Sequence, residues 1–138
     1  MQLKSRLFAA EIILSALGMA ISIYLAASHY AGFSVACPII GPVNCAALLN
    51  SRYASLAGVP VSVFGIAFFV IVLSLIALRK KVAKALFAST GLGFVFYFLY
   101  LEYLLGKICL YCTAVHIIVV SLLAISIYEM WMQSKKEK

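Results

Sequence analysis

Four long apolar stretches constrain the fold of this chain more than any other feature. Each covers about 20 residues or more, the length that an α-helix needs to cross roughly 30 Å of hydrocarbon. They are residues 7–28, 59–78, 85–105 and 108–131. Only 11% of the residues are charged, against roughly 25% in an ordinary soluble domain. The sequence therefore predicts an all-α integral membrane protein, in which residues 1–138 form one domain with four transmembrane helices.

The distribution of basic residues predicts how this bundle is oriented. Nine of the eleven Lys and Arg residues lie in the terminal segments or between the second and third stretches: Lys4, Arg6, Arg79, Lys80, Lys81, Lys84, Lys135, Lys136 and Lys138. Only Arg52 and Lys107 lie in the other connections. Because short loops rich in Lys and Arg stay in the cytoplasm, we expect both termini to be cytoplasmic and residues 29–58 to form a long outer loop. We expect a multi-pass protein of the cell (inner or plasma) membrane, in contact with lipid and without a nucleic-acid partner.

All four cysteines fall on the predicted outer side. Cys37 and Cys45 lie in the long loop, and Cys109 and Cys112 begin the last helix. An even number of cysteines that face an oxidising compartment indicates disulfide chemistry. A helix N-terminus and the neighbouring Lys107 both favour the thiolate, which is the species that attacks in disulfide exchange.

The four cysteines are open to two other interpretations. The spacing of Cys109 and Cys112 suits zinc, but Cys37 and Cys45 are too far apart for a usual knuckle and no outward His cluster accompanies them. We therefore predict no metal site. A non-enzymatic protein with four membrane spans and two structural disulfides is the other alternative, although a C-x-x-C bridge closes a very small ring and removes little chain entropy.

The two cysteine pairs differ in what can reach them. A soluble protein could reach the Pro- and Gly-rich loop, whereas a lipid-soluble molecule could reach the pair at the membrane edge. This difference suggests a relay of electrons from a soluble dithiol through both pairs to an acceptor. The sequence contains no dinucleotide fingerprint, iron–sulfur cysteine run or membrane His pair for a haem. We expect no tightly bound cofactor, and by elimination a membrane quinone, of the ubiquinone or menaquinone type, as the accepting substrate.

The order of these motifs resembles the vitamin K epoxide reductase family over nearly the whole chain. The resemblance rests on Cys37 and Cys45, Ser51-Arg52-Tyr53, Gly58-Val-Pro60, Ser62-Val-Phe-Gly65 and Cys109-x-x-Cys112. The bacterial disulfide-bond formation protein B also has four helices and two cysteine pairs, but there the C-x-x-C comes in the first outer loop.

The resemblance implies a role for each cysteine. Cys37 would receive electrons from a reduced thioredoxin-like (DsbA-like) protein, Cys45 would attack Cys109, and Cys112 would face the quinone. Because the sequence ends at Lys138 without a thioredoxin-like domain, we expect the partner to be a separate protein. By the same resemblance, Tyr53, Phe64, Phe68, Tyr97 and the face of the last helix after Cys112 would line the quinone pocket, and Ser51 would help to position it.

His116 is a further candidate for the pocket. It lies four residues after Cys112, hence on the same helical face, and a His within a membrane helix is a functional candidate that could donate a hydrogen bond to a quinone oxygen or carry a proton. Vertebrate members of the family carry Tyr at the position of His116 and Asn at that of Val61. We therefore favour quinone reduction coupled to disulfide formation, with reduction of a vitamin K-type epoxide or quinone as the alternative.

Two further predictions concern local features of the chain. Residues 44–49 are expected to form a helical turn or two along the membrane surface. Three glutamates near the ends of the apolar stretches, Glu11, Glu102 and Glu129, are expected to reach the interface or to pair with nearby Lys or Arg residues.

Overall fold

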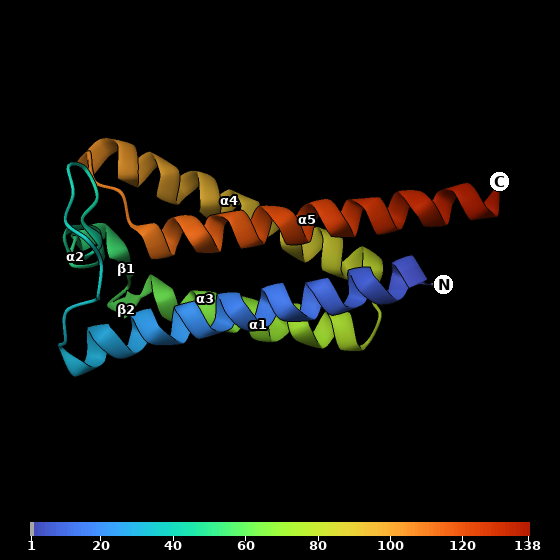
Figure 1. The fold of residues 1–138 in the computed structure, drawn as a ribbon, viewed down its shortest axis with the longest axis horizontal. Helices are drawn as coiled ribbons and strands as arrows, with labels where there is room; N and C mark the ends of the chain where they lie inside the picture. The colour runs from blue at the N-terminus through green and yellow to red at the C-terminus, as the bar shows by residue number, and fades with distance from the viewer. Residues whose placement is uncertain (1) are drawn as a thin grey trace.

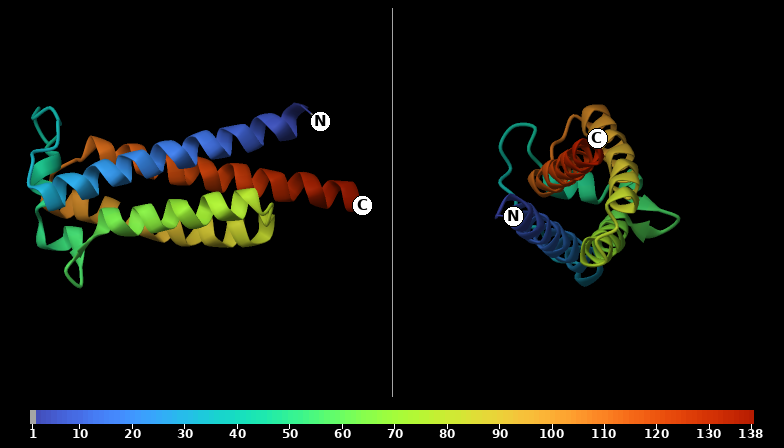
Figure 2. Two further views of the ribbon diagram at one scale, coloured as in Figure 1. Left: turned by 90° about the horizontal axis from the view of Figure 1, so that it is seen from below. Right: turned by 90° about the vertical axis from the view of Figure 1, so that its right-hand side faces the viewer.

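Four long helices form the body of the molecule. The computed structural model describes residues 2–138, and its long helices are α1 (Gln2–Ala31), α3 (Val61–Ala77), α4 (Lys81–Leu105) and α5 (Leu110–Glu137). They pack in the cyclic order α1, α3, α4, α5, and Figure 2 shows them end-on around a common axis. Between α1 and α3 lie α2 (Cys45–Leu49), the 3-10 helix η1 (Arg52–Ala54) and the strands β1 (Ser55–Leu56) and β2 (Val59–Pro60).

The bundle has two chemically different ends. Both termini and the turn between α3 and α4 lie at one end (Figure 1), here called the basic end because it carries Lys4, Arg79, Lys81 and Lys135. The short elements between α1 and α3 lie at the opposite end together with the turn between α4 and α5, and we call this the cysteine end. Gly106, which closes α4 with a φ of 59° in the left-handed region, forms that turn as a glycine commonly does after a helix.

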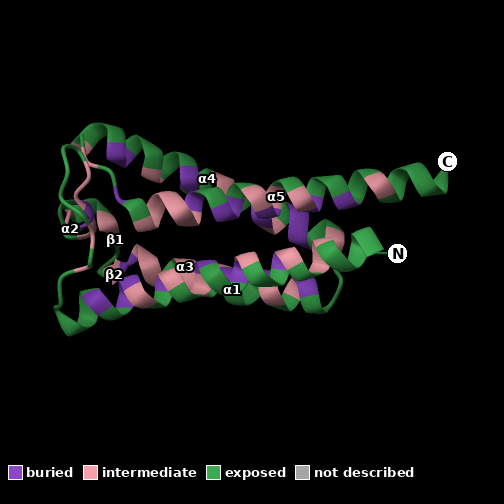
Figure 3. Cartoon of the chain, viewed as in Figure 1, coloured by how far each residue is buried: buried purple, intermediate pink, exposed green. Residues whose placement is uncertain are grey.

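The helices are built for an apolar surrounding. α1, α4 and α5 are long and apolar enough to cross a membrane, and α3 is a shorter apolar helix of 17 residues, about 26 Å long at 1.5 Å per residue. Exposed positions run along the outside of every long helix (Figure 3), and many of them are large and apolar, among them Ile13, Leu17, Leu86, Phe96, Ile117 and Ile127. These features are those of an all-α membrane protein, as predicted.

The start of the second predicted span differs from the prediction. We expected a helix from residue 59, but Val59 and Pro60 form β2, which pairs antiparallel with β1. The reason is the turn between the strands, where Ala57 and Gly58 have φ values of 52° and 82°. Positive φ at both central residues is the geometry of a tight hairpin turn, so the chain reverses here before α3 begins. The short helix predicted at residues 44–49 is confirmed as α2.

Close contact between α1 and α3 holds the centre of the bundle. Phe69 is fully buried in a core with Val72 and Leu122, and a Cβ placed on Gly18 would lie 2.2 Å from its Cζ atom. Gly18 therefore lets the ring of Phe69 press against the backbone of α1, which is how small residues serve helix contacts in membranes.

A buried ion cluster joins three helices toward the basic end. Lys84 of α4 pairs with Glu11 of α1 and, at 2.9 Å, with Glu129 of α5, and all three side chains are at most 10% exposed. The prediction that these glutamates pair with a basic residue is confirmed for Glu11 and Glu129. Glu102 is not in an ion pair within residues 2–138; its carboxylate accepts the backbone N–H of Cys109 at 3.3 Å, and the alternative that it reaches the interface stays a prediction.

Candidate functional site

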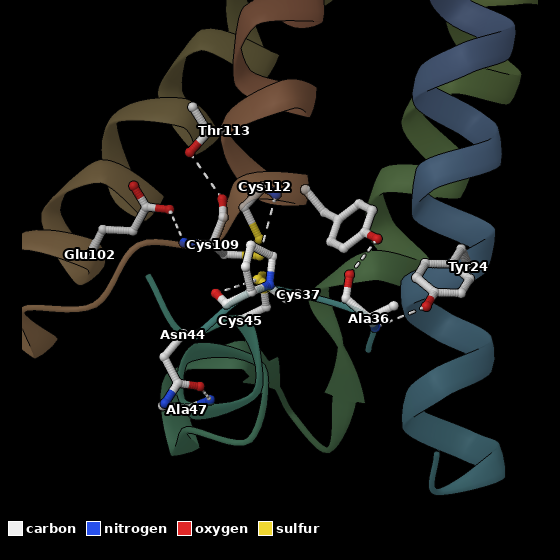
Figure 4. Close-up of a disulfide and its surroundings, with 12 residues drawn as sticks. Tyr24, Ala36, Cys37, Asn44, Cys45, Ala47, Glu102, Cys109, Cys112 and Thr113 are labelled. Carbon is white, nitrogen blue, oxygen red and sulfur yellow. Dashed lines mark hydrogen bonds between the residues drawn. A yellow bond between two sulfur atoms is a disulfide. The ribbon is translucent and has the colours of Figure 1, made fainter. Parts of the chain in front are cut away.

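The four cysteines meet at the cysteine end. Cys45 and Cys109 are buried in one apolar cluster with Leu48, and Cys37 and Cys112 pack against it. Cys37 and Cys45 form a disulfide, whereas Cys109 and Cys112 are free thiols. Figure 4 shows this disulfide facing the first turn of α5. The fold therefore joins two cysteine pairs that are far apart in the sequence.

Backbone hydrogen bonds attach the loop to the segment before α5. The N–H of Ile108 donates to the carbonyl of Pro42 at 2.8 Å, and the N–H of Asn44 donates to the carbonyl of Ile108 at 3.0 Å. The side chain of Asn44 then caps α2 by accepting the N–H of Ala47 at 3.0 Å, as a residue of this type does at a helix start. Because Cys45 follows Asn44 and Cys109 follows Ile108, this bridge brings Cys45 and Cys109 together.

Groups in the first turn of α5 lower the pKa of the Cys109 thiol. Its Sγ atom caps the helix and accepts the N–H of Cys112 at 3.4 Å. Cys109 lies just outside the candidate spanning helix, which begins at Leu110 and not at residue 108 as we predicted. Hydrogen bonds from the thiol of Cys112 and from the backbone N–H groups of Cys112 and Tyr111 lower the pKa of Cys109, against burial and the nearby charge of Glu102, which raise it. These hydrogen bonds, rather than the charge of Lys107 that we expected to contribute, favour the thiolate.

The solvent exposure of the four cysteines changes in a regular order from the loop to the cavity. Cys37 is half-buried, Cys45 is 1% exposed and Cys109 is fully buried. Cys112 is half-buried again, but it lines a cavity in the bundle. In the loop pair, Cys37 is thus the more exposed cysteine and Cys45 is buried. In the helix pair, Cys109 is buried and Cys112 lies at the cavity.

The cavity has a volume of about 460 Å³ and lies between the four long helices and the loop. This volume is within the usual range for small-molecule sites. Seven phenylalanine rings contribute to its mostly apolar wall: Phe33, Phe64, Phe68, Phe69, Phe87, Phe94 and Phe98. Cys112 and His116, one turn apart on α5, bring polar atoms to this wall.

His116 has an unpartnered polar atom at this wall. Its side chain is buried, and Nδ1 has no hydrogen-bond partner among residues 2–138. Its ring lies 6.0 Å from that of Phe98, centroid to centroid. Since buried polar groups are nearly always hydrogen-bonded, the free nitrogen marks a place where a bound molecule can be recognised.

The predicted pocket residues divide into two groups. Phe64, Phe68 and His116 line the cavity, while Ser51, Tyr53 and Tyr97 lie outside its lining. Tyr97 is replaced there by Phe98, because one residue turns a helix by about 100°.

The two loop residues lie near the cavity without lining it. Ser51 donates its hydroxyl to the carbonyl of Leu48 at 2.7 Å and so closes α2. Tyr53 is half exposed in η1. Ser51 therefore lies at the end of α2, next to Asn50, which is in the lining.

Sequence reasoning missed the contribution of α4. Phe87, Gly91, Phe94 and Phe98 all line the cavity, and their spacing of four, three and four residues places them on one helical face. That periodicity was the signal that could have found them. Gly91 leaves room for the ring of Phe68, which would lie 2.7 Å from an added Cβ atom.

The described residues, 2–138, contain no cluster of three or more His, Cys, Asp or Glu side chains that could hold a metal ion.

Comparison with known families agrees with this geometry. The model of the vitamin K epoxide reductase family matches residues 9–127, which include all four cysteines and the cavity. The chain belongs to the vitamin K epoxide reductase family. A search of curated proteins finds no match. As a member of the vitamin K epoxide reductase family, the chain is a multi-pass membrane oxidoreductase.

Proposed function

We propose that this protein oxidises the dithiol of a thioredoxin-like protein and passes the two electrons to a membrane quinone. The observation that carries the proposal is the order of accessibility, from half-buried Cys37 through buried Cys45 and Cys109 to Cys112 at the cavity. That order matches a path from a soluble donor to a lipid-soluble acceptor. Its biological result would be disulfide formation in proteins outside the cytoplasm.

The first half of the reaction occurs at the loop pair. A thiolate of the partner attacks Cys37, and Cys45 leaves as a thiolate. The partner's second thiol then attacks the mixed disulfide, so that the partner leaves oxidised and the loop pair is reduced. Cys37 suits this role because it is the more accessible cysteine of the disulfide.

The second half moves the electrons inward. The Cys45 thiolate attacks Cys109 of an oxidised helix pair, Cys112 leaves, and Cys37 attacks Cys45 to restore the loop disulfide. The two thiols of the helix pair then give two electrons and two protons to the quinone, and the Cys109–Cys112 disulfide forms again. A loop disulfide beside two free helix thiols corresponds to the state that precedes quinone reduction.

The cavity offers the features that a quinone requires. Its aromatic wall suits an apolar ring and the start of an isoprenoid chain. Cys112 and His116 lie on the same wall, so a quinone carbonyl beside the sulfur could accept a hydrogen bond from Nδ1 of His116. The same nitrogen could hold a proton for the reduced ring. A ubiquinone or menaquinone type is expected.

The orientation is part of the proposal. Lys and Arg residues concentrate at the basic end, and such segments stay in the cytoplasm. The cysteine end would then face the outside of the cell (inner or plasma) membrane, where the compartment is oxidising.

The cavity wall favours a quinone over a vitamin K-type epoxide. Val61 and His116 both line the cavity, at the two positions where vertebrate members of the family carry Asn and Tyr. An apolar Val61 offers no hydrogen bond to an epoxide oxygen. The non-enzymatic alternative loses support, because the family is one of oxidoreductases and two of the four cysteines are free.

The test is an anaerobic assay of the purified protein with a reduced thioredoxin-like protein and a ubiquinone or menaquinone analogue. We expect one quinone to be reduced for each partner disulfide, as followed by quinone absorbance. Cys112→Ala should abolish turnover, whereas Ser121→Ala, a matched change on the same helix, should leave it intact. Turnover by Cys112→Ala, or reduction of an epoxide substrate by the wild type in place of a quinone, would overturn the proposal.

A further inference from the structure

We propose that the basic end of the bundle holds a binding site for the phosphate group of an anionic membrane lipid. The site is a second cavity, of about 360 Å³, between the first turns of α1, the end of α3 and the start of α4. The elements that line it meet at the basic end, opposite the short elements between α1 and α3 (Figure 1). A lipid at this end would have no part in the redox function.

Three cations at this cavity have no acidic partner. Lys4, Arg79 and Lys81 line it, and the ion pairs within residues 2–138 involve none of them. Both carboxylates of the cavity, those of Glu11 and Glu129, instead pair with Lys84. With four cations against two carboxylates, the cavity carries excess positive charge, and phosphate is the anion that Lys and Arg side chains bind in basic pockets between membrane helices.

The backbone at Arg79 gives this site a specific feature. Arg79 has a φ of 53°, in the left-handed region, directly after the C-cap of α3. Glycine is the usual residue at such a position, because an L side chain is strained there. The conformation of the turn is therefore not stabilised by an arginine at this position. The guanidinium lies over the ring of Phe8, with 5.5 Å from Cζ to the ring centroid, and so the side chain is held at the cavity.

The rest of the wall favours a lipid over free phosphate. Phe8, Leu75 and Ile76 make one side of the cavity apolar, next to the cations. Leu78 and Val82, which flank the turn, are 67% and 60% exposed and would lie among acyl chains. The ends of helices that cross a bilayer lie at the level of the lipid headgroups. A phosphate diester with acyl chains satisfies both the charged and the apolar side, whereas inorganic phosphate satisfies only the first.

Native mass spectrometry with phosphatidylglycerol and phosphatidylcholine tests the site. We expect the wild type to retain one phosphatidylglycerol in preference to phosphatidylcholine. Since each cation near an anionic lipid accounts for about a five-fold change in affinity, Arg79→Gly should weaken retention about five-fold and Arg79→Gly with Lys81→Gln about 25-fold. Arg79→Gly also relieves the backbone, so its thermal unfolding temperature should stay the same or rise.

The matched control removes two cations from the same end but outside the cavity. Lys135→Gln with Lys136→Gln on α5 should leave phosphatidylglycerol retention unchanged. Equal weakening by this control would mean diffuse attraction to a basic end and would overturn the site. Displacement of the lipid by millimolar inorganic phosphate would overturn the lipid assignment in favour of free phosphate.

Discussion

The hydroxyl of Tyr111 donates a hydrogen bond of 2.7 Å to the carbonyl of Ala36, the residue before Cys37. The backbone N–H of Ala36 donates to the hydroxyl of Tyr24 at 3.2 Å (Figure 4). The rings of Tyr24 and Tyr111 lie 5.5 Å apart, centroid to centroid. Tyr24 belongs to α1, and Tyr111 stands between Cys109 and Cys112. Both polar groups of this exposed backbone unit are therefore held by side chains, which fixes Cys37 relative to the helix pair.

Tyr111→Phe removes this hydrogen bond and keeps the ring. Because a hydrogen bond of this kind contributes about 1 kcal/mol, we expect turnover with the thioredoxin-like partner to fall about five-fold, measured by quinone absorbance. Tyr103→Phe is the matched control, since Tyr103 is 85% exposed at the same end of the bundle. Equal turnover of Tyr111→Phe and this control would show that the hydrogen bond does not position Cys37.

The proximity of Cys45 and Cys109 predicts a disulfide that can be trapped. In Cys37→Ser with Cys112→Ser, only these two cysteines remain, and both lie in one buried cluster. We expect them to form a bond on mild oxidation, detected by non-reducing peptide mapping, because a disulfide requires Cα atoms within about 4.4–6.8 Å. Cys37→Ser with Cys109→Ser, which leaves Cys45 and Cys112, should form less of it. A trapped yield no higher than in this control would rule out the inward exchange step.

The free nitrogen of His116 predicts a defect limited to the quinone step. We expect His116→Phe to lower quinone reduction by the reduced protein up to about ten-fold, the effect of one lost hydrogen bond. Reduction of the Cys109–Cys112 disulfide by the partner should continue at the wild-type rate, as measured by trapping of free thiols in the absence of quinone. His116→Gln, which keeps a donor, should recover part of the loss. A defect of equal size in both steps would assign His116 a structural role only.

The apolar pattern of the sequence predicted the helical bundle because an uninterrupted apolar run of about 20 residues is typical of a membrane-spanning helix. The hairpin before α3 was missed for a local reason. Both central residues of its turn, Ala57 and Gly58, have positive φ. Of these two, only Gly58 is a residue type that indicates such a turn in a sequence. The end at which the cysteines gather could be predicted because the charge distribution assigns both connections to one side. The pairing of Pro42 and Asn44 with Ile108 could not, since backbone hydrogen bonds depend little on side-chain type.

The cavity and the ion cluster depend on which side of each helix faces the interior of the bundle. The sequence indicates this only weakly, because these helices are apolar on all sides. Tyr97 looked suitable because of its depth and its hydroxyl, but the neighbouring Phe98 faces the cavity. Lys84 belonged by sequence to a basic turn. In the structure α4 begins at Lys81, which places Lys84 within the helix and turns its side chain inward between Glu11 and Glu129.

Lys84 predicts a large effect on stability. Removal of one partner from a buried ion cluster leaves a buried charge without compensation and costs about 3–5 kcal/mol. We therefore expect Lys84→Met to unfold at a clearly lower temperature in detergent, while Lys135→Met, at the same end but on the exposed terminal turns of α5, should not. Adding Glu11→Gln and Glu129→Gln to Lys84→Met should restore part of the loss, because no unpaired charge then remains. A wild-type unfolding temperature in Lys84→Met would show that the cluster contributes nothing to stability.

The lowered pKa of Cys109 predicts how the reduction potential of the helix pair depends on pH. While both thiols are protonated, reduction of the disulfide takes up two electrons and two protons, and the potential falls by about 59 mV per pH unit. Above the pKa of Cys109 only one proton is taken up, and the slope falls to about 30 mV per unit. Because the hydrogen bonds from Cys112 and Tyr111 lower that pKa from its ordinary value of 9.0, the change of slope should occur below pH 9.

Redox titration of Cys37→Ser with Cys45→Ser isolates the helix pair for this measurement. Glu102→Gln in the same background provides the matched comparison, since the negative charge of Glu102 opposes the Cys109 thiolate. Its removal should move the change of slope to still lower pH. A single slope of about 59 mV per unit up to pH 9 would mean that Cys109 has an ordinary thiol and that the first turn of α5 does not prepare it for exchange.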